Sequence, residues 1–277
     1  IFFLMVDIRG YKNINLSAKI WLSDLKKHLN FNKKSIGSDE VNSGSSSFIR
    51  KVESNMDNVD NVNIGEIHIW RKEEVKKVFI HELIHSLNFD FFHYPDEFKQ
   101  MILSKFNIEN KGIDLFRMGE AYVETWASIL NTIIVSFIQN KSYRGYLKLM
   151  SYEINFSIFQ IAKILHFYGY DCIDKCNLSF MNKNHNIKFI QESSVFSYYY
   201  IKSCLLFNLN KFIEYCTYYN DKLFIFKHEN LSKFHNLITN CLINDQFKKE
   251  VDKTIKLISN IKNHTKLFTN LRMTINE

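Results

Sequence analysis

The stretch KEEVKKVFIHELIHSL (Lys72–Leu87) determines how the rest of the chain is interpreted. At 100° per residue its apolar side chains form one broad stripe, which predicts a helix with one face in the core. Acidic residues at its start suit the positive end of the helix dipole. The stripe consists of Val75, Phe79, Leu83 and Leu87, widened by Ile80 and Ile84.

Two histidines of this helix have the spacing of metal ligands. His81 and His85 are four residues apart, so their rings project from one face, one turn apart. That spacing can hold one Zn²⁺ through two ring nitrogens. Glu82 lies one step round the helix, where a carboxylate can take a proton from a metal-bound water. We therefore expect one Zn²⁺, bound by the two histidines, with Glu82 as the catalytic base.

A catalytic zinc site needs a third protein ligand and leaves a fourth position for water. The histidine pattern of the metzincins does not continue here, because Phe91 occupies the position of the third histidine and His93 is two residues out of register. A later predicted helix, Phe116–Ile138, supplies two carboxylates one turn apart, Glu120 and Glu124. Either could complete the ligand set.

With these residues the sequence resembles the gluzincin metallopeptidases, the superfamily of thermolysin, neprilysin and the zinc aminopeptidases. The resemblance covers His81–His85 and Glu120–Ala127 only. In gluzincins a small residue commonly follows the ligand glutamate by three positions, and Ala127 follows Glu124 in this way, so Glu124 is the preferred metal ligand. Several gluzincins instead place an acidic residue four positions after the ligand, which would make Glu120 the ligand. Glu120 is thus either the alternative ligand or a residue that orients a histidine.

The resemblance implies two further features. Gluzincins usually carry an edge strand before the histidine helix, antiparallel to the bound peptide, and Gly65–Trp70 alternates in the way expected of such a strand. They also use a tyrosine or histidine to stabilise the oxyanion. The candidates here are Tyr198, Tyr199 and Tyr200, each of which could instead be a packing aromatic.

Two other functions compete with zinc-dependent hydrolysis of peptide bonds. A non-catalytic zinc-binding pseudoenzyme could act as a protein-interaction module, although a purely structural site gains nothing from Glu82. A helical interaction protein could carry the motif by chance, with both histidines satisfied inside its core. Metal content and peptide hydrolysis separate the three.

Composition favours helices. The 277 residues include one proline and eight glycines, which argues against a turn-rich all-β fold. We expect a mostly α (α+β) fold, with residues 1–110 forming an N-terminal lobe that carries a small sheet and the zinc-binding helix. Residues 111–277 would form a helical C-terminal lobe with the third ligand, and the active-site cleft would lie between the lobes.

Several elements outside the motif are predicted from local pattern. Ile1–Ile8 reads as a buried strand, Ser17–Leu29 as an amphipathic helix, and residues 32–63 as a long polar loop. Residues 95–106 form a short helix, and further helices follow Tyr143, with the clearest break at Asn182–Asn186.

Charge and cysteine content suggest which substrates the protein binds and in which compartment it lies. A net charge of +7 favours acidic substrates, but the lysines are scattered and no nucleic-acid motif is present. The five cysteines have no framework spacing and are expected to be reduced. With no signal peptide or membrane span recognised, a cytosolic location is expected. The excess of residues with A/T-rich codons suits a large DNA virus or an AT-rich parasite, so host cytoplasm or a virion is the expectation for a viral source. The partner is a peptide or protein substrate.

Overall fold

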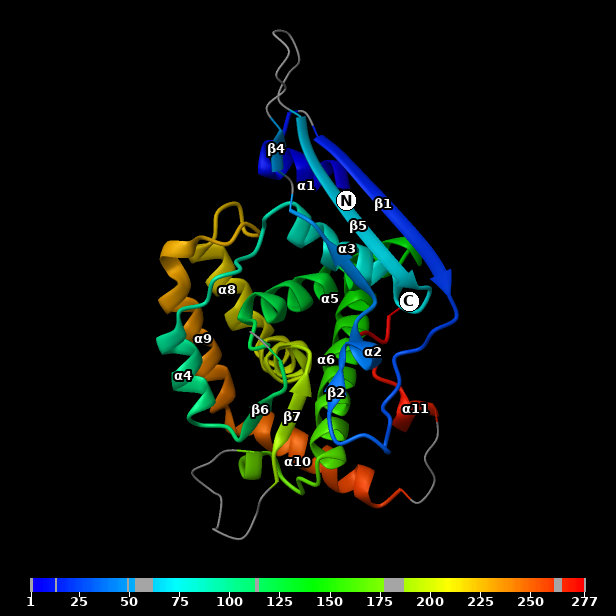
Figure 1. Ribbon diagram of the computed structural model, residues 1–277, viewed down its shortest axis with the longest axis vertical. Helices are drawn as coiled ribbons and strands as arrows, with labels where there is room; N and C mark the ends of the chain where they lie inside the picture. Colours follow the sequence, from blue (N-terminus) through cyan, green and yellow to red (C-terminus); the bar gives the residue numbers. More distant parts are fainter. Residues whose placement is uncertain are drawn as a thin grey trace.

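The computed structural model describes residues 2–12, 14–48, 50–52, 62–112, 115–176, 187–261 and 266–276, and it is mostly helical with two small sheets (Figure 1). The α-helices are α1 (Phe2–Arg9), α2 (Ser38–Val41), α3 (Val75–Ser86), α4 (Asp96–Leu103), α5 (Met118–Ile138), α6 (Tyr143–Phe167), α7 (Lys202–Phe207), α8 (Leu209–Tyr219), α9 (Leu231–Leu242), α10 (Asp245–Ser259) and α11 (Lys266–Thr269). The described residues also include two 3₁₀ turns, η1 (Ile173–Cys176) and η4 (His228–Asn230), and a π-helix, η3 (Phe196–Ile201). The expected mostly α (α+β) class is confirmed.

The first sheet has four strands and lies beside α3. Its central strand is β5 (Val62–Arg71), which pairs in parallel with β1 (Ile14–Ser23) on one side. On the other side β5 pairs antiparallel with β3 (Gly44–Ser46) and with β4 (Arg50–Val52). Ile67 and Ile69 are fully buried, so the strand expected at Gly65–Trp70 is confirmed. It is not an edge strand, however, because β1 and β3 flank it.

The second sheet has three strands in the order β2 (Ile36–Gly37), β7 (Phe189–Glu192) and β6 (Ile108–Asn110), all parallel. It connects the segment before α3 with the helical part of the chain that follows. The proposed division at residue 110/111 stays a prediction, although β6 ends at this boundary and pairs with a strand from beyond it.

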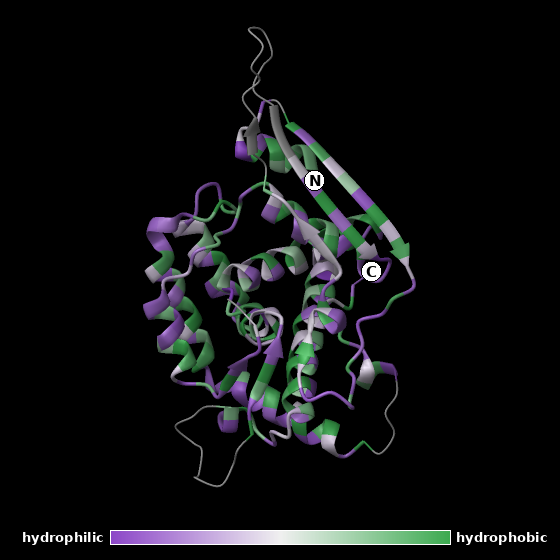
Figure 2. Cartoon of the chain, in the orientation of Figure 1, coloured by the Kyte–Doolittle hydropathy of each residue, from purple (hydrophilic) through white to green (hydrophobic). Residues whose placement is uncertain are grey.

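Helices α5 and α6 run through the middle of the molecule, with α8 and α9 to one side of them and α10 below in this view (Figure 1). Hydropathy follows this arrangement: α4 and α9 present polar residues outward and apolar residues inward (Figure 2). Among the described helices, α5 alone has the length and hydropathy to cross a membrane. However, 72% of its most apolar stretch is buried inside the protein. It is packed as a core helix.

Two predictions for the N-terminal region are wrong. The described part of the segment expected as a strand at Ile1–Ile8 belongs to α1, and Gly10 directly after this helix has the positive φ of 81° that glycine adopts without strain. A short apolar run has no period that separates strand from helix. The amphipathic helix expected at Ser17–Leu29 is instead β1 and an irregular segment, because pairing with β5 outweighs local propensity.

The long loop expected at residues 32–63 is also wrong for the part that the structure describes. It contains β2, α2, β3 and β4, although residues 53–61 lie outside the described residues. The serines at 43–47 have little apolar character, so only backbone pairing with β5 makes part of this segment a strand. The predicted break at Asn182–Asn186 falls outside the described residues.

Other predictions are confirmed. The helices expected at Lys72–Leu87, 95–106 and Phe116–Ile138 correspond to α3, α4 and α5, each trimmed by a few residues. All five cysteines are free thiols. The start of α3 differs in one respect: Glu74 is not in its first turn but at the N-cap, in a left-handed conformation with φ of 60°.

Candidate metal centre

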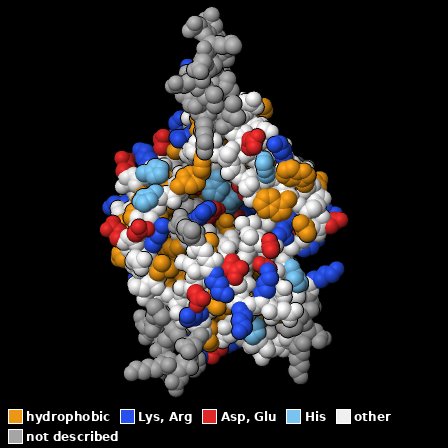
Figure 3. Space-filling view, in the orientation of Figure 1, with side chains coloured by type: hydrophobic (Ala, Val, Ile, Leu, Met, Phe, Trp, Pro, Cys, Tyr) orange, Lys and Arg blue, Asp and Glu red, His pale blue; other side chains and the backbone are white. Residues whose placement is uncertain are grey.

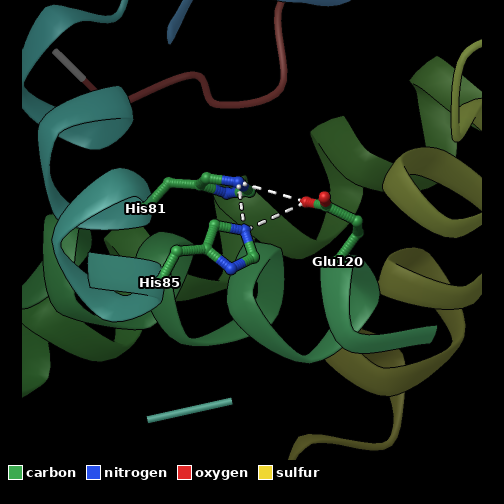
Figure 4. Close-up of side chains that lie close together, drawn as sticks. All are labelled: His81, His85 and Glu120. Atoms are coloured by element: carbon green, nitrogen blue, oxygen red, sulfur yellow. Dashed lines mark hydrogen bonds and ion pairs between the residues drawn. The ribbon is translucent and has the colours of Figure 1, made fainter. Parts of the chain in front are cut away.

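Helix α3 brings the rings of both motif histidines together. The side chains of His81 and His85 are buried, with 7% and 9% of their surface exposed. They lie on the face of α3 that packs against α5. Their Nε2 atoms lie 3.1 Å apart. The four-residue spacing therefore has the predicted consequence for the geometry of the two rings (Figure 4).

Glu120, in the first turn of α5, supplies the third group. Its Oε2 lies 3.3 Å from Nε2 of His81 and 3.2 Å from Nε2 of His85. Gly119 permits this approach, since a Cβ there would lie 2.2 Å from the carbonyl oxygen of Phe91. The start of α5 can therefore pack against the loop after α3 only with glycine at this position.

The three atoms form a nearly equilateral triangle. In a tetrahedral zinc site with bonds of about 2.0–2.1 Å, neighbouring ligand atoms lie roughly 3.3 Å apart. The observed separations are 3.1, 3.2 and 3.3 Å. Among the described residues, His81, His85 and Glu120 are the group of His, Cys, Asp and Glu side chains close enough together to hold a metal ion. Two nitrogens and one carboxylate leave a fourth position open.

Acidic partners lie at the opposite ring nitrogens: the contact at His85 is aligned as a hydrogen bond, and the contact at His81 is an ion-pair contact. Nδ1 of His85 lies 2.7 Å from Oδ2 of Asp90, and Nδ1 of His81 lies 2.8 Å from Oε1 of Glu124. When Nδ1–H faces a carboxylate, the proton stays there and the lone pair of Nε2 is available to a metal. Asp90 reaches His85 because the chain turns back after α3, at Asn88, whose φ is 54°. The motif alone gave no signal for Asp90.

Glu120, the alternative ligand of the sequence analysis, lies with the two histidines, whereas Glu124, the preferred ligand, lies outside this group. Glu124 was preferred as ligand, but its carboxylate lies on the Nδ1 side of His81, where it also binds the buried ammonium of Lys77. Glu120, one turn earlier on α5, faces both Nε2 atoms. The small Ala127 is fully buried, as expected of a packing position, but it does not identify the ligand.

Charges favour the ionised form of each group in this cluster, which raises the pKa of the histidine and lowers the pKa values of the two glutamates. Burial opposes the charged form of His85, but Asp90 and Glu120 outweigh it and raise the pKa well above its usual value. Burial likewise opposes ionisation of Glu120, yet His85 and His81 hold the pKa of this carboxyl far below normal. For Glu124, Lys77 and His81 overcome burial and lower the pKa strongly. The acids are therefore ionised, and the histidines attract positive charge.

Glu82 is held by strand β3. Its Oε2 accepts a hydrogen bond of 2.8 Å from the hydroxyl of Ser46, and the side chain is 6% exposed. A Cβ at Gly44 would lie 2.8 Å from Oε1 of Glu82 and 2.9 Å from a methyl of Val78. The carboxylate of Glu82 therefore occupies the space that a side chain at position 44 would need.

The tyrosine triplet separates into three environments. Tyr198 lines the same cavity as the two histidines, and its ring lies 6.4 Å from that of His81. Tyr199 donates its hydroxyl to the carbonyl oxygen of Leu271 at 2.5 Å, away from the site. Tyr200 packs on Phe106 and Phe196. The triplet lies on the π-helix η3, a form that is frequent at functional sites.

A cavity of about 450 Å³ opens above the triangle. Figure 3 shows a hollow on this face with histidine and acidic side chains at its floor. Phe48 and Phe92 meet edge to face at 3.9 Å on its wall, with Phe92 exposed and 6.4 Å from the ring of His85. Its lining comes from the β3 segment, α3, the loop after α3, the start of α5, and η3: Asn42, Gly44, Ser45, Ser46, Phe48, His81, Glu82, His85, Asp90, Phe91, Phe92, Arg117, Gly119, Glu120 and Tyr198.

Comparison with known proteins adds one relative. An uncharacterized protein of Acanthamoeba polyphaga mimivirus is 26% identical over 208 residues, which is 71% of this chain and 48% of the relative. The chain therefore spans about half the length of that protein. No family model matches the sequence, and no solved structure matches the fold.

Proposed function

We propose that this chain is a zinc-dependent metallopeptidase in which His81, His85 and Glu120 hold one Zn²⁺ and Glu82 is the catalytic base. The observation that carries the proposal is the triangle of Nε2, Nε2 and Oε2 atoms at 3.1–3.3 Å. Two histidines and a glutamate are the donor set of catalytic zinc sites of the thermolysin type.

Electrostatics supports a divalent cation at this position. Two ring lone pairs and a carboxylate oxygen converge at hydrogen-bond distance, while both Nδ1 atoms already face acids. Within the described part of the chain, the cluster brings together four carboxylates, those of Glu82, Asp90, Glu120 and Glu124, while the ammonium of Lys77 binds Glu124 and the guanidinium of Arg117 lines the cavity. Such an excess of buried negative charge is costly unless a cation or protons balance it. The residues therefore fit the metal.

The chemistry follows from the positions of the side chains. Zn²⁺ bound there would lower the pKa of a coordinated water to about 7 and polarise a carbonyl oxygen. Glu82, held between Gly44 and the Ser46 hydroxyl, would take a proton from that water and pass it to the leaving amine. Tyr198 would donate its hydroxyl to the developing oxyanion, since burial and the nearby carboxylates raise its pKa and keep it protonated.

Strand β3 supplies a place for the substrate backbone. The β3 segment bonds β5 through Ser43 and Ser47, at distances of 3.0 and 2.9 Å. Alternation along an antiparallel strand then directs the backbone groups of Gly44 and Ser46 away from β5. An extended peptide could pair with this edge. The edge expected at Gly65–Trp70 is thus supplied by β3, and the polypeptide substrate remains the proposed partner.

The test combines metal analysis with hydrolysis. Wild-type protein should carry about one equivalent of zinc and cleave members of a peptide library, whereas Glu82→Gln should keep the metal and lose most turnover. His81→Ala is the control that loses both. Wild-type protein that binds no Zn²⁺ would overturn the metal site. Zinc binding without hydrolysis of any peptide would favour the non-catalytic interaction module.

A further inference from the structure

Three lysine–glutamate pairs lie buried beneath the metal centre. Lys27 pairs with Glu74 at 2.8 Å, Lys77 with Glu124, and Lys202 with Glu153 at 3.8 Å. None of these six side chains is more than 3% exposed. Burying an ion pair often costs more than it returns, and an apolar pair of similar size is often as stable. Three such pairs together suggest a role other than stability.

The C-terminal segment Leu271–Asn276 is held by these charges, although it has no regular secondary structure. Oε1 of Glu74 accepts the backbone N–H groups of Met273 and Thr274, both at 2.6 Å. Oε2 of Glu153 accepts the Thr274 hydroxyl at 2.7 Å and the N–H of Ile275 at 3.1 Å. Lys202 donates to the carbonyl of Met273.

One of the three pairs reaches the metal centre directly. Lys77 lies one turn before His81 on α3, and its ammonium binds both oxygens of Glu124. The same ammonium lies 3.8 Å from the sulfur of Met273. Oε1 of Glu124 is in turn 2.8 Å from Nδ1 of His81. Contacts therefore run without a break from the C-terminal segment through Lys77 and Glu124 to a proposed ligand.

The two proposed histidine ligands consequently have unlike supports. His85 faces Asp90, a carboxylate with no buried ammonium bound to it among the described residues. His81 faces a carboxylate that an ammonium neutralises and fixes in place. A carboxylate behind a ligand histidine sets its orientation and its strength as a donor. Lys77 therefore contacts the carboxylate that faces His81 and not the carboxylate that faces His85.

We infer that Lys77 is a positioning residue of the metal centre, which acts through Glu124 on the ring of His81. This inference rests on the proposed zinc site. In the absence of the ammonium, the buried Glu124 would lose its main partner and would no longer hold the ring of His81 at a fixed angle.

The test is Lys77→Met, measured with Co²⁺ as a probe of geometry and Zn²⁺ as a probe of affinity. The expected result is a folded protein whose Zn²⁺ affinity is lower by about 10- to 100-fold, the usual effect of losing a supporting partner. The visible absorption of the Co²⁺ form should also change in position or intensity. Lys77→Arg, which keeps the charge, should stay closer to wild type in both.

Lys27→Met is the matched control, because it removes an equally buried ammonium that pairs with Glu74 and not with Glu124. It should lower thermal stability and leave the Co²⁺ spectrum unchanged. If Lys77→Met does not fold, the double variant Lys77→Met/Glu124→Gln removes both charges together and is compared with wild type. Wild-type affinity and spectrum in Lys77→Met, or in the double variant, would overturn the inference. Absence of Co²⁺ and Zn²⁺ binding in the wild-type protein would instead overturn the metal site.

Discussion

Glu124 lies 2.8 Å from Nδ1 of His81, on the side of the ring opposite the Nε2 that faces Glu120. The two glutamates of α5 are thus one turn apart and touch one imidazole from its two sides. Since a ring nitrogen that keeps its proton cannot bind a metal, the two acids have different tasks. Glu120 lies at the proposed metal position, and Glu124 lies where it can orient the ring.

This arrangement predicts an order of metal affinity. Glu120→Gln should weaken Zn²⁺ binding more than 100-fold, because it removes a ligand charge. Glu124→Gln should weaken it by about 10- to 100-fold, as expected when an orienting partner is lost. Competition titration with a chromophoric chelator measures both. Equal losses, or a larger loss for Glu124→Gln, would return the ligand role to Glu124.

Tyr198→Phe isolates the proposed oxyanion donor. Loss of one such donor lowers kcat by about 10²- to 10³-fold, and KM and zinc content should change little. Tyr199→Phe is the control on the adjacent residue, whose hydroxyl bonds Leu271 and not the cavity. It should cost about 1–3 kcal/mol of stability and leave kcat near wild type. A Tyr198→Phe enzyme with unchanged kcat would exclude this tyrosine from the chemistry.

The sequence sufficed for the part of the site that depends on helix periodicity. His81, Glu82 and His85 are placed by α3 itself, so their spacing specified their geometry. The choice between Glu120 and Glu124 depended on how α5 crosses α3. That crossing is set by Gly119 against the carbonyl of Phe91, a contact that no local pattern encodes.

The errors at β1 and β3 share one physical origin. β1 and β3 are strands because they pair with β5, from residues far away in the chain. Their own sequences are polar or ambiguous, so tertiary pairing overrode local propensity. Asp90 and Lys77 could not be predicted for the same reason. Their contacts with His85 and Glu124 exist only in the folded chain.

Proton competition gives a pH prediction for metal binding. The pKa of His85 is raised well above 6.5 and that of His81 is raised, because neighbouring carboxylates outweigh burial. In the metal-free protein the rings of His81 and His85 therefore stay protonated to a higher pH than an isolated histidine. Zn²⁺ must displace these protons when it binds. Apparent affinity should keep rising from pH 6.5 to pH 8. Calorimetry in buffers of different ionisation enthalpy should show proton release on binding near pH 7; its absence would contradict these shifts.

Gly44→Ala tests whether strand β3 holds the catalytic base. A Cβ at this position would lie 2.8 Å from Oε1 of Glu82, closer than unbonded atoms tolerate, so the carboxylate must move. Since misplacement of a reacting group by about 1 Å can cost about 10²-fold, kcat should fall by that order while zinc affinity stays near wild type. Gly112→Ala is the control, because a Cβ there meets only the side chain of Leu115, at 3.1 Å. Peptide turnover and metal titration of both variants decide the matter: a Gly44→Ala protein with normal kcat would show that Glu82 is not positioned by this strand, and a large loss of zinc would show that the strand supports the ligands instead.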